Sequence, residues 1–102
     1  MHEKSSFAVF MQESGNVGSA YQEAMQALSE ASALDRKTDE LAYIAILAAV
    51  RQTEEVPVHV KAAKLLGATR DEIKSAVLVG MPAVGFAVTE AFAVALKSYD
   101  EE

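Results

Sequence analysis

The longest apolar run in the chain is Leu41–Val50, in which Tyr43 is the one residue with a polar group. Apolar side chains would surround a helix formed by this run almost completely. We therefore expect it to be central, buried by the rest of the domain or by a second subunit. Asp35 is suited to cap the first turn, where Asp39 and Glu40 would interact favourably with the helix dipole. The run predicts the helix around which the chain is organised.

Two helices are predicted before this run. The first lies within residues 1–16 and ends at Ser14-Gly15-Asn16, because this triplet favours a turn. The second extends from about residue 16 to residue 33 and is amphipathic, so one of its faces should lie in a core or an interface. Its apolar stripe, at i, i+4 and i+7, consists of Tyr21, Met25 and Leu28.

Pro57 predicts the start of the next helix, over residues 57–66. Proline fixes its own φ and favours the first helical turn, and it should push Val56 away from helical geometry. Gly67 is suited to the position that follows the helix end. The side chains that we expect this helix to bury are Val58, Ala62, Leu65 and Leu66.

Thr69 and Glu72 are spaced as a capping box, which predicts a fifth helix from residue 70. Gly80-Met81-Pro82 interrupts the pattern, either as a kink or as a break into a sixth helix that continues to about Ser98. No period-2 alternation typical of strands is present. The predicted fold is all-α, a single-domain bundle of about six helices over residues 1–102.

Composition supports one packed domain. The 102 residues are 51% hydrophobic and 24% charged, which allows one core and leaves no room for a second. Two helices that are apolar all round are one too many for a monomer of this size to cover. The surplus predicts a homo-oligomer that assembles through apolar helices.

Charge and cysteine content exclude several classes. A net charge of −6, with no large Lys/Arg cluster, argues against a nucleic-acid partner. The apolar run is about half the ~20 residues that a bilayer requires, so no membrane partner is expected. The chain contains no cysteine, which excludes disulfides and thiolate metal sites within it. Its expected location is the cytoplasm.

Glu40 and His59 are the candidate chemical groups, because each shares a predicted helical face with apolar residues. Glu40 could equally be a solvated acid of a first turn, and His59 could be a satisfied core or interface residue. As a functional group, His59 would be a general acid or base, since imidazole titrates near neutral pH. Glu55, four residues earlier, is close enough to hold a ring nitrogen. Zinc or a di-iron site would need more ligands, so we expect no metal and no cofactor.

Three segments in fixed order resemble the carboxymuconolactone decarboxylase family, which includes the alkylhydroperoxidase D-like proteins. The segments read KTDELAYIAI, then HVKAAKLLGATRDEI, then VGMPAVGFA. The resemblance covers about residues 7–98. It implies the alkylhydroperoxidase D-like helical fold, and the expected assembly is a trimer or a hexamer built as a trimer of dimers.

The peroxidase branch of that family uses an acid, then Cys-x-x-Cys, then a histidine. The resemblance places the acid at Glu40 and the histidine at His59, and the two cysteine positions at Gln52 and Glu55. A chain without cysteine cannot form the sulfenic acid and the disulfide of that chemistry. Thiol-dependent peroxidase activity is therefore not expected.

The decarboxylase branch tends to carry a glutamate four residues before the histidine, as Glu55 and His59 stand here. That branch also tends to have another histidine and a basic residue just before this glutamate. This chain has Glu54 and Gln52 at those positions, and Arg51 directly precedes Gln52.

The resemblance implies a lyase of decarboxylase type that acts on a small organic acid or lactone. His59 would transfer a proton, Glu55 would orient the imidazole, and Glu40 would hold the far side of an apolar pocket at a subunit contact. Arg51 and Gln52 would receive the substrate. The alternative is a non-catalytic family member in which the Glu/His network is structural.

Overall fold

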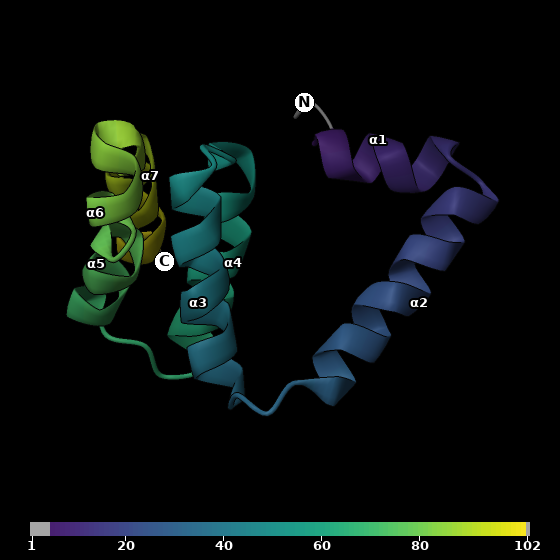
Figure 1. The fold of residues 1–102 in the computed structure, drawn as a ribbon, viewed down its shortest axis with the longest axis horizontal. Coiled ribbons are helices and arrows are strands. Elements are labelled where there is room, and N and C mark those ends of the chain that lie inside the picture. The colour runs from purple at the N-terminus through teal and green to yellow at the C-terminus, as the bar shows by residue number, and fades with distance from the viewer. Residues whose placement is uncertain (1–4, 102) are drawn as a thin grey trace. The chain divides into compact units, whose positions relative to one another are not determined.

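The computed structural model describes residues 5–101, and all regular structure in this range is helical (Figure 1). This confirms the all-α prediction. The described range contains seven α-helices and two short 3₁₀-helices, because the expected sixth helix is divided. The elements are α1 (Ser6–Glu13), α2 (Asn16–Ala31), α3 (Arg36–Ala49), η1 (Thr53–Glu55), α4 (Val56–Leu65), α5 (Arg70–Leu78), α6 (Met81–Val84), η2 (Gly85–Val88) and α7 (Thr89–Asp100).

The chain divides into two compact units, one ending at Ala33 and the other beginning at Leu34. The first unit contains α1 and α2, joined at Gly15, whose φ of 59° is readily adopted by glycine. The rings of Phe7 and Phe10 both contact the ring of Tyr21, with centroids 6.3 and 5.7 Å from the Tyr21 centroid. The predicted stripe of α2 is exposed along its length. A single domain over residues 1–102 stays a prediction.

The second unit is an arrangement of four long helices. α3 packs against α4 and α5, α7 packs against the same two helices, and α3 and α7 make a smaller contact with each other. The small elements α6 and η2 connect α5 to α7 (Figure 1). The buried apolar core between these helices consists of Ile44, Leu47, Ala48, Val56, Val60, Ala63, Ala68, Ile73, Ala76, Val77, Val88, Ala91 and Ala95.

The start of α3 forms as its sequence predicts. The Asp35 carboxylate accepts a hydrogen bond from the Thr38 backbone N–H at 2.9 Å, which satisfies one of the helix's free donors. One face of the helix is buried in the core, but Ile46 and Val50 on another face are exposed. The second unit alone therefore covers only part of this apolar helix.

The start of α4 differs from the prediction. Val56 is helical, with φ −57° and ψ −46°, although it precedes Pro57. The general bias against helical geometry before proline is outweighed here, because Val56 follows the η1 turn and is completely buried in the core.

The predicted buried face of α4 is wrong for two of its four residues. Val58 and Leu65 are 62% and 89% exposed, Ala62 and Leu66 are half-buried, and the buried residues are Val56, Val60 and Ala63. Both sets have helical spacing, and packing against α3 and α7 selects the second set.

The capping box at the start of α5 is confirmed. The Thr69 hydroxyl accepts from the Glu72 N–H at 3.0 Å, and the Glu72 carboxylate accepts from the Thr69 N–H at 2.8 Å. The glycine-proline segment after α5 is a break rather than a kink. Gly85, at φ 69°, then separates α6 from η2, so the expected sixth helix becomes three elements that end at Asp100.

The helical stretch Arg70–Asp100 is long and apolar enough, by length and composition, to cross a membrane. In the second unit its two long helices, α5 and α7, pack against each other, and six of its residues belong to the core. One stretch of this kind is weak evidence for a span, and 17% of its most apolar window is buried. The absence of a membrane partner stays a prediction.

Candidate functional site

Glu40 and His59 meet at the contact between α3 and α4. Oε2 of Glu40 lies 2.7 Å from Nδ1 of His59, although the residues are 19 positions apart in the sequence. The side chains are 27% and 25% exposed respectively, so the pair is partly desolvated and still accessible. The packing of α3 on α4 thus brings together the two candidate groups.

The contact determines what each ring nitrogen can do. A carboxylate accepts hydrogen bonds, so Nδ1–H of His59 donates to Glu40. In the neutral ring the unprotonated nitrogen is then Nε2, which can accept a proton. In the charged ring Nε2–H can donate one. The pair has the arrangement of a histidine general acid/base oriented by a carboxylate.

Tyr43 completes the surroundings of the imidazole. Its ring centroid lies 4.6 Å from that of His59, with an angle of 66° between the ring planes. Tyr43 follows Glu40 by three residues, so both side chains lie on neighbouring positions of one face of α3. The sequence argument did not assign Tyr43 a role. The available signal was its position as the one polar residue in an apolar run, one turn after the candidate acid.

The other predicted site residues lie in the connection between α3 and α4. In the part of the chain that the structure describes, the carboxylate bonded to the His59 ring is that of Glu40, and Glu55 makes no such bond. Glu55 is the last residue of η1, directly before α4, and is half-buried. Gln52 precedes η1 and is exposed. The expected orientation of His59 by Glu55 is therefore corrected to orientation by Glu40.

Arg51 has an unusual backbone conformation. Its φ is 62°, the one positive value at a non-glycine residue in the described range. Its guanidinium Nε lies 3.8 Å from the Glu90 carboxylate of α7, and both side chains are more than half exposed, at 60% and 57%. An ion pair this long and this exposed holds the guanidinium weakly, so Arg51 can bind another anion.

No group of three or more metal-ligating side chains is present within residues 5–101. Glu40 and His59 supply two ligating side chains, which is fewer than the protein ligands of a zinc or di-iron site. The site can carry acid–base chemistry with the residues it has, and the expectation of no cofactor stays a prediction.

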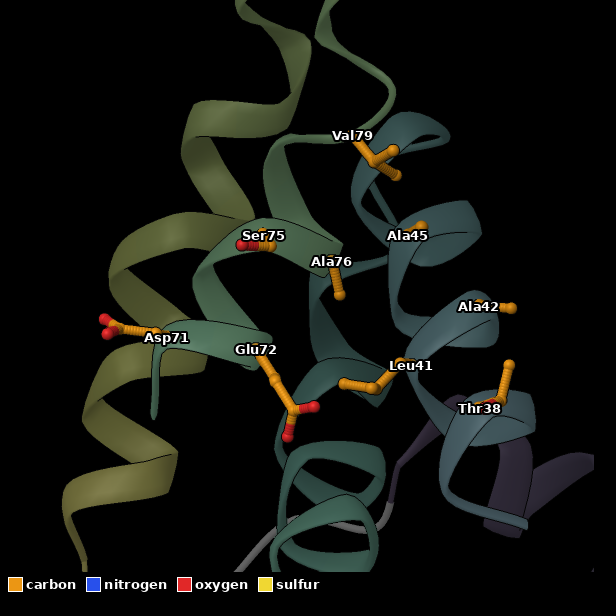
Figure 2. Close-up of a pocket in the computed structure, with 9 residues that line it drawn as sticks. All are labelled: Thr38, Leu41, Ala42, Ala45, Asp71, Glu72, Ser75, Ala76 and Val79. Atoms are coloured by element: carbon orange, nitrogen blue, oxygen red, sulfur yellow. The ribbon is translucent and has the colours of Figure 1, made fainter. Parts of the chain in front are cut away.

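A separate groove of about 490 Å³ lies between α3 and α5, and Figure 2 shows the side chains that line it. Its walls are mainly apolar, with Leu41 and Ala42 on one side and Ala76 and Val79 on the other. Neither this groove nor a second one beside Leu65 includes the Glu40–His59 pair. Two carboxylates, Asp71 and Glu72, also line the α3–α5 groove, but no histidine does, so the Glu40–His59 pair stays the candidate site for acid–base chemistry.

The carboxylate at the edge of the groove serves the fold. The Thr69 backbone N–H, and then Lys37, hold the pKa of Glu72 below its ordinary value. Lys37 Nζ lies 3.0 Å from Glu72 Oε2, which ties the start of α5 to α3. The resolved change in the pKa of Glu72 therefore reflects capping rather than catalysis.

Comparison with family models gives one match. The model of the carboxymuconolactone decarboxylase family matches residues 16–97, which is more than half of the chain. The chain belongs to the carboxymuconolactone decarboxylase family. The match extends over α2 and through most of α7 and includes both residues of the Glu40–His59 pair. As a cysteine-free member, this decarboxylase-family protein lacks the thiols of the peroxidase branch.

Comparisons with curated proteins and with solved structures found no match. The family membership therefore rests on the family model, and it agrees with the all-α fold described above.

Proposed function

We propose that this protein is a decarboxylase-like lyase that acts on a small organic acid or lactone, with Glu40 and His59 as its acid–base pair. The observation that carries the proposal is the 2.7 Å contact between Glu40 Oε2 and His59 Nδ1. This contact leaves Nε2 of a partly exposed imidazole to exchange protons with a substrate. Family membership supports the reaction class.

The proposed step needs no redox partner. The carbon–carbon bond to the departing carboxylate breaks, carbon dioxide leaves, and the electron pair stays on the substrate carbon. Nε2–H of the protonated His59 ring delivers a proton to that carbon, and the ring recovers its proton from water. Glu40 stabilises the charged ring through Nδ1–H and holds its orientation.

The α3–α4 connection is the proposed substrate-binding side of the site. Arg51 would bind a carboxylate of the substrate, because its guanidinium is weakly held by Glu90 and presents several donors. Gln52 is exposed beside it and would add an amide donor. Glu55, one residue before α4, is proposed to contact the substrate rather than the His59 ring.

The active form is proposed to be a homo-oligomer, a trimer or a hexamer built as a trimer of dimers. Large apolar side chains are exposed on the second unit, among them Ile46 on α3, Val50 directly after α3, and Val58 on α4, next in sequence to His59. Exposed apolar surface of this kind commonly marks a subunit contact. A second subunit over this face would exclude water from the pair and provide the apolar pocket. The cytoplasm stays the proposed location.

The test is turnover of carboxymuconolactone and a panel of related lactones by the wild type and three variants. We expect His59→Ala to lower kcat by at least about 100-fold and Glu40→Gln by about tenfold, since general acid–base catalysis contributes factors of this order. Asp39→Asn is the matched control, because it removes the same charge one residue away on α3 and should leave kcat unchanged. No activity above buffer across the panel would reject the proposal.

The alternative is a non-catalytic protein in which the Glu40–His59 pair orders the α3–α4 contact. A partly buried hydrogen bond between charged groups supports this reading as well. It predicts that His59→Ala lowers the melting temperature and that no lactone is turned over. An unchanged melting temperature at equal protomer concentration would count against it.

A further inference from the structure

The Tyr43 ring lies against the imidazole of His59, edge to face, with centroids 4.6 Å apart and an interplanar angle of 66°. Tyr43 comes from the same helix as Glu40, three residues later. One face of α3 therefore contacts the imidazole twice, through a carboxylate at Nδ1 and through an aromatic ring.

A hydrogen bond at one nitrogen alone fixes the ring incompletely. The outer torsion of a histidine side chain is broad and roughly two-fold, so the imidazole can rotate away from a single partner. A rotation of the ring plane away from the observed orientation would move Nδ1 out of hydrogen-bond reach of Glu40. The neutral ring would then gain nothing from carrying its proton on Nδ1.

The Tyr43 ring limits this rotation because it occupies the space beside the imidazole. Aromatic pairs prefer tilted contacts at the separation seen here, so the contact is favourable in the observed orientation. Tyr43 is 43% exposed, and its ring contacts the histidine.

We propose that Tyr43 is a positioning residue, whose ring keeps the His59 imidazole turned with Nδ1 to Glu40 and Nε2 to the substrate. Tyr43 acts through His59 and does not exchange a proton itself. The kinetic consequence rests on the proposed function, whereas the orientation of the ring does not.

The test measures the protonation of each ring nitrogen by ¹⁵N NMR of the full-length protein. The chain has two histidines, so the His59 signals can be assigned with the His59→Ala variant. Spectra are recorded as a pH series, and the proteins are compared where the ¹⁵N shifts themselves show the neutral ring. We expect the wild type to show a single form with the proton on Nδ1.

Tyr43→Leu keeps an apolar side chain and removes the ring, and Tyr43→Phe keeps the ring. We expect Tyr43→Leu to show a mixture of Nδ1–H and Nε2–H forms, with kcat lowered about tenfold and KM nearly unchanged. Tyr43→Phe should match the wild type in both measurements. Phe86→Leu is the control, because it also removes an aromatic ring, here one that is 81% exposed on η2, whereas the ring against His59 is that of Tyr43.

A pure Nδ1–H form in Tyr43→Leu would overturn the proposal, and so would a mixture in Tyr43→Phe, which would assign the effect to the hydroxyl. If Tyr43→Leu does not fold, as judged by circular dichroism, Tyr43→Met provides a second ring-free variant. A wild type that turns over no lactone would reject the proposed function. The NMR comparison would still decide the role of Tyr43.

Discussion

The helices α3 and α4 end in the same backbone motif but carry different residues at its strained position. At the end of α3, the Arg51 N–H donates to the Ala48 carbonyl at 3.3 Å and the Gln52 N–H to the Leu47 carbonyl at 2.9 Å. This pair of bonds is the Schellman motif. In this motif the first of the two donor residues, just beyond the end of the helix, adopts the left-handed conformation. Arg51 is that residue, with φ 62°.

The end of α4 shows the usual solution. Gly67 N–H donates to the Lys64 carbonyl at 3.0 Å and Ala68 N–H to the Ala63 carbonyl at 2.9 Å. Gly67 has φ 99°, and a Cβ built on it would meet no atom within 4 Å, so only the backbone conformation disfavours a side chain there. The chain therefore provides an internal reference for Arg51.

We predict that Arg51→Gly raises the free energy of unfolding by about 0.5–1 kcal/mol. A left-handed conformation costs an L-residue roughly 1–2 kcal/mol, and glycine avoids this cost. The greater freedom of glycine in the unfolded chain offsets about 0.5–1 kcal/mol of that gain. The lost contact with Glu90 subtracts little, because that pair is long and exposed.

The assay is urea unfolding at fixed protomer concentration, with Arg51→Ala as the control. Arg51→Ala loses the same charge but keeps a Cβ, so it should not gain stability. Gly67→Ala should lower the free energy of unfolding by about 1 kcal/mol, because alanine would have to adopt the positive φ of Gly67. If Arg51→Gly is no more stable than Arg51→Ala, relief of backbone strain is the wrong explanation. If Arg51 also binds the substrate, Arg51→Gly should be more stable and show a higher KM.

Three further outcomes are expected. A double-mutant cycle with Glu40→Ala and His59→Ala should give a coupling energy of about 1–2 kcal/mol in urea unfolding, and a value near zero would show that the 2.7 Å contact contributes nothing. The pKa of Glu72 is lowered by the Thr69 N–H, so its contribution to stability is present above pH 4.5 and is lost as the pH falls through the folded-state value. Glu72→Gln should therefore weaken the acid dependence of the urea midpoint, and equal dependence in both proteins would contradict this. Ile46→Glu should shift the protein to a smaller species in size-exclusion chromatography, whereas an unchanged elution volume would place the subunit contact elsewhere.

Local signals in the sequence predicted the caps and breaks well. The Asp35 cap and the Thr69–Glu72 capping box depend on side chains three residues apart, and such contacts form wherever the helix begins. The break after α5 was readable for the same reason, because glycine and proline act on their own backbone.

The sequence identified Glu40 and His59 as candidate groups but not their contact with each other. The short sequence separation suggested Glu55 as the partner of His59. Glu55 is the last residue of η1, and in the described residues the carboxylate bonded to the His59 ring is that of Glu40. The actual partner, Glu40, is 19 residues away and meets His59 only through the packing of α3 on α4.

The buried face of α4 could not be read from the sequence, because two apolar stripes compete. One contains Val56, Val60 and Ala63, and the other contains Val58 and Leu65. Periodicity fits both, and only the positions of α3 and α7 decide which one enters the core. The stripe that stays exposed belongs to the surface for which a second subunit is proposed.

The central claim is that His59, oriented by Glu40, transfers the proton of a decarboxylation, and chemical rescue tests it most directly. Release of carbon dioxide from carboxymuconolactone would be followed with the wild type and with His59→Ala, each with and without added imidazole. The account predicts that His59→Ala loses at least about 100-fold in rate and that imidazole restores part of it without affecting the wild type. A His59→Ala protein as active as the wild type, or a wild type with no activity above buffer, would contradict the account.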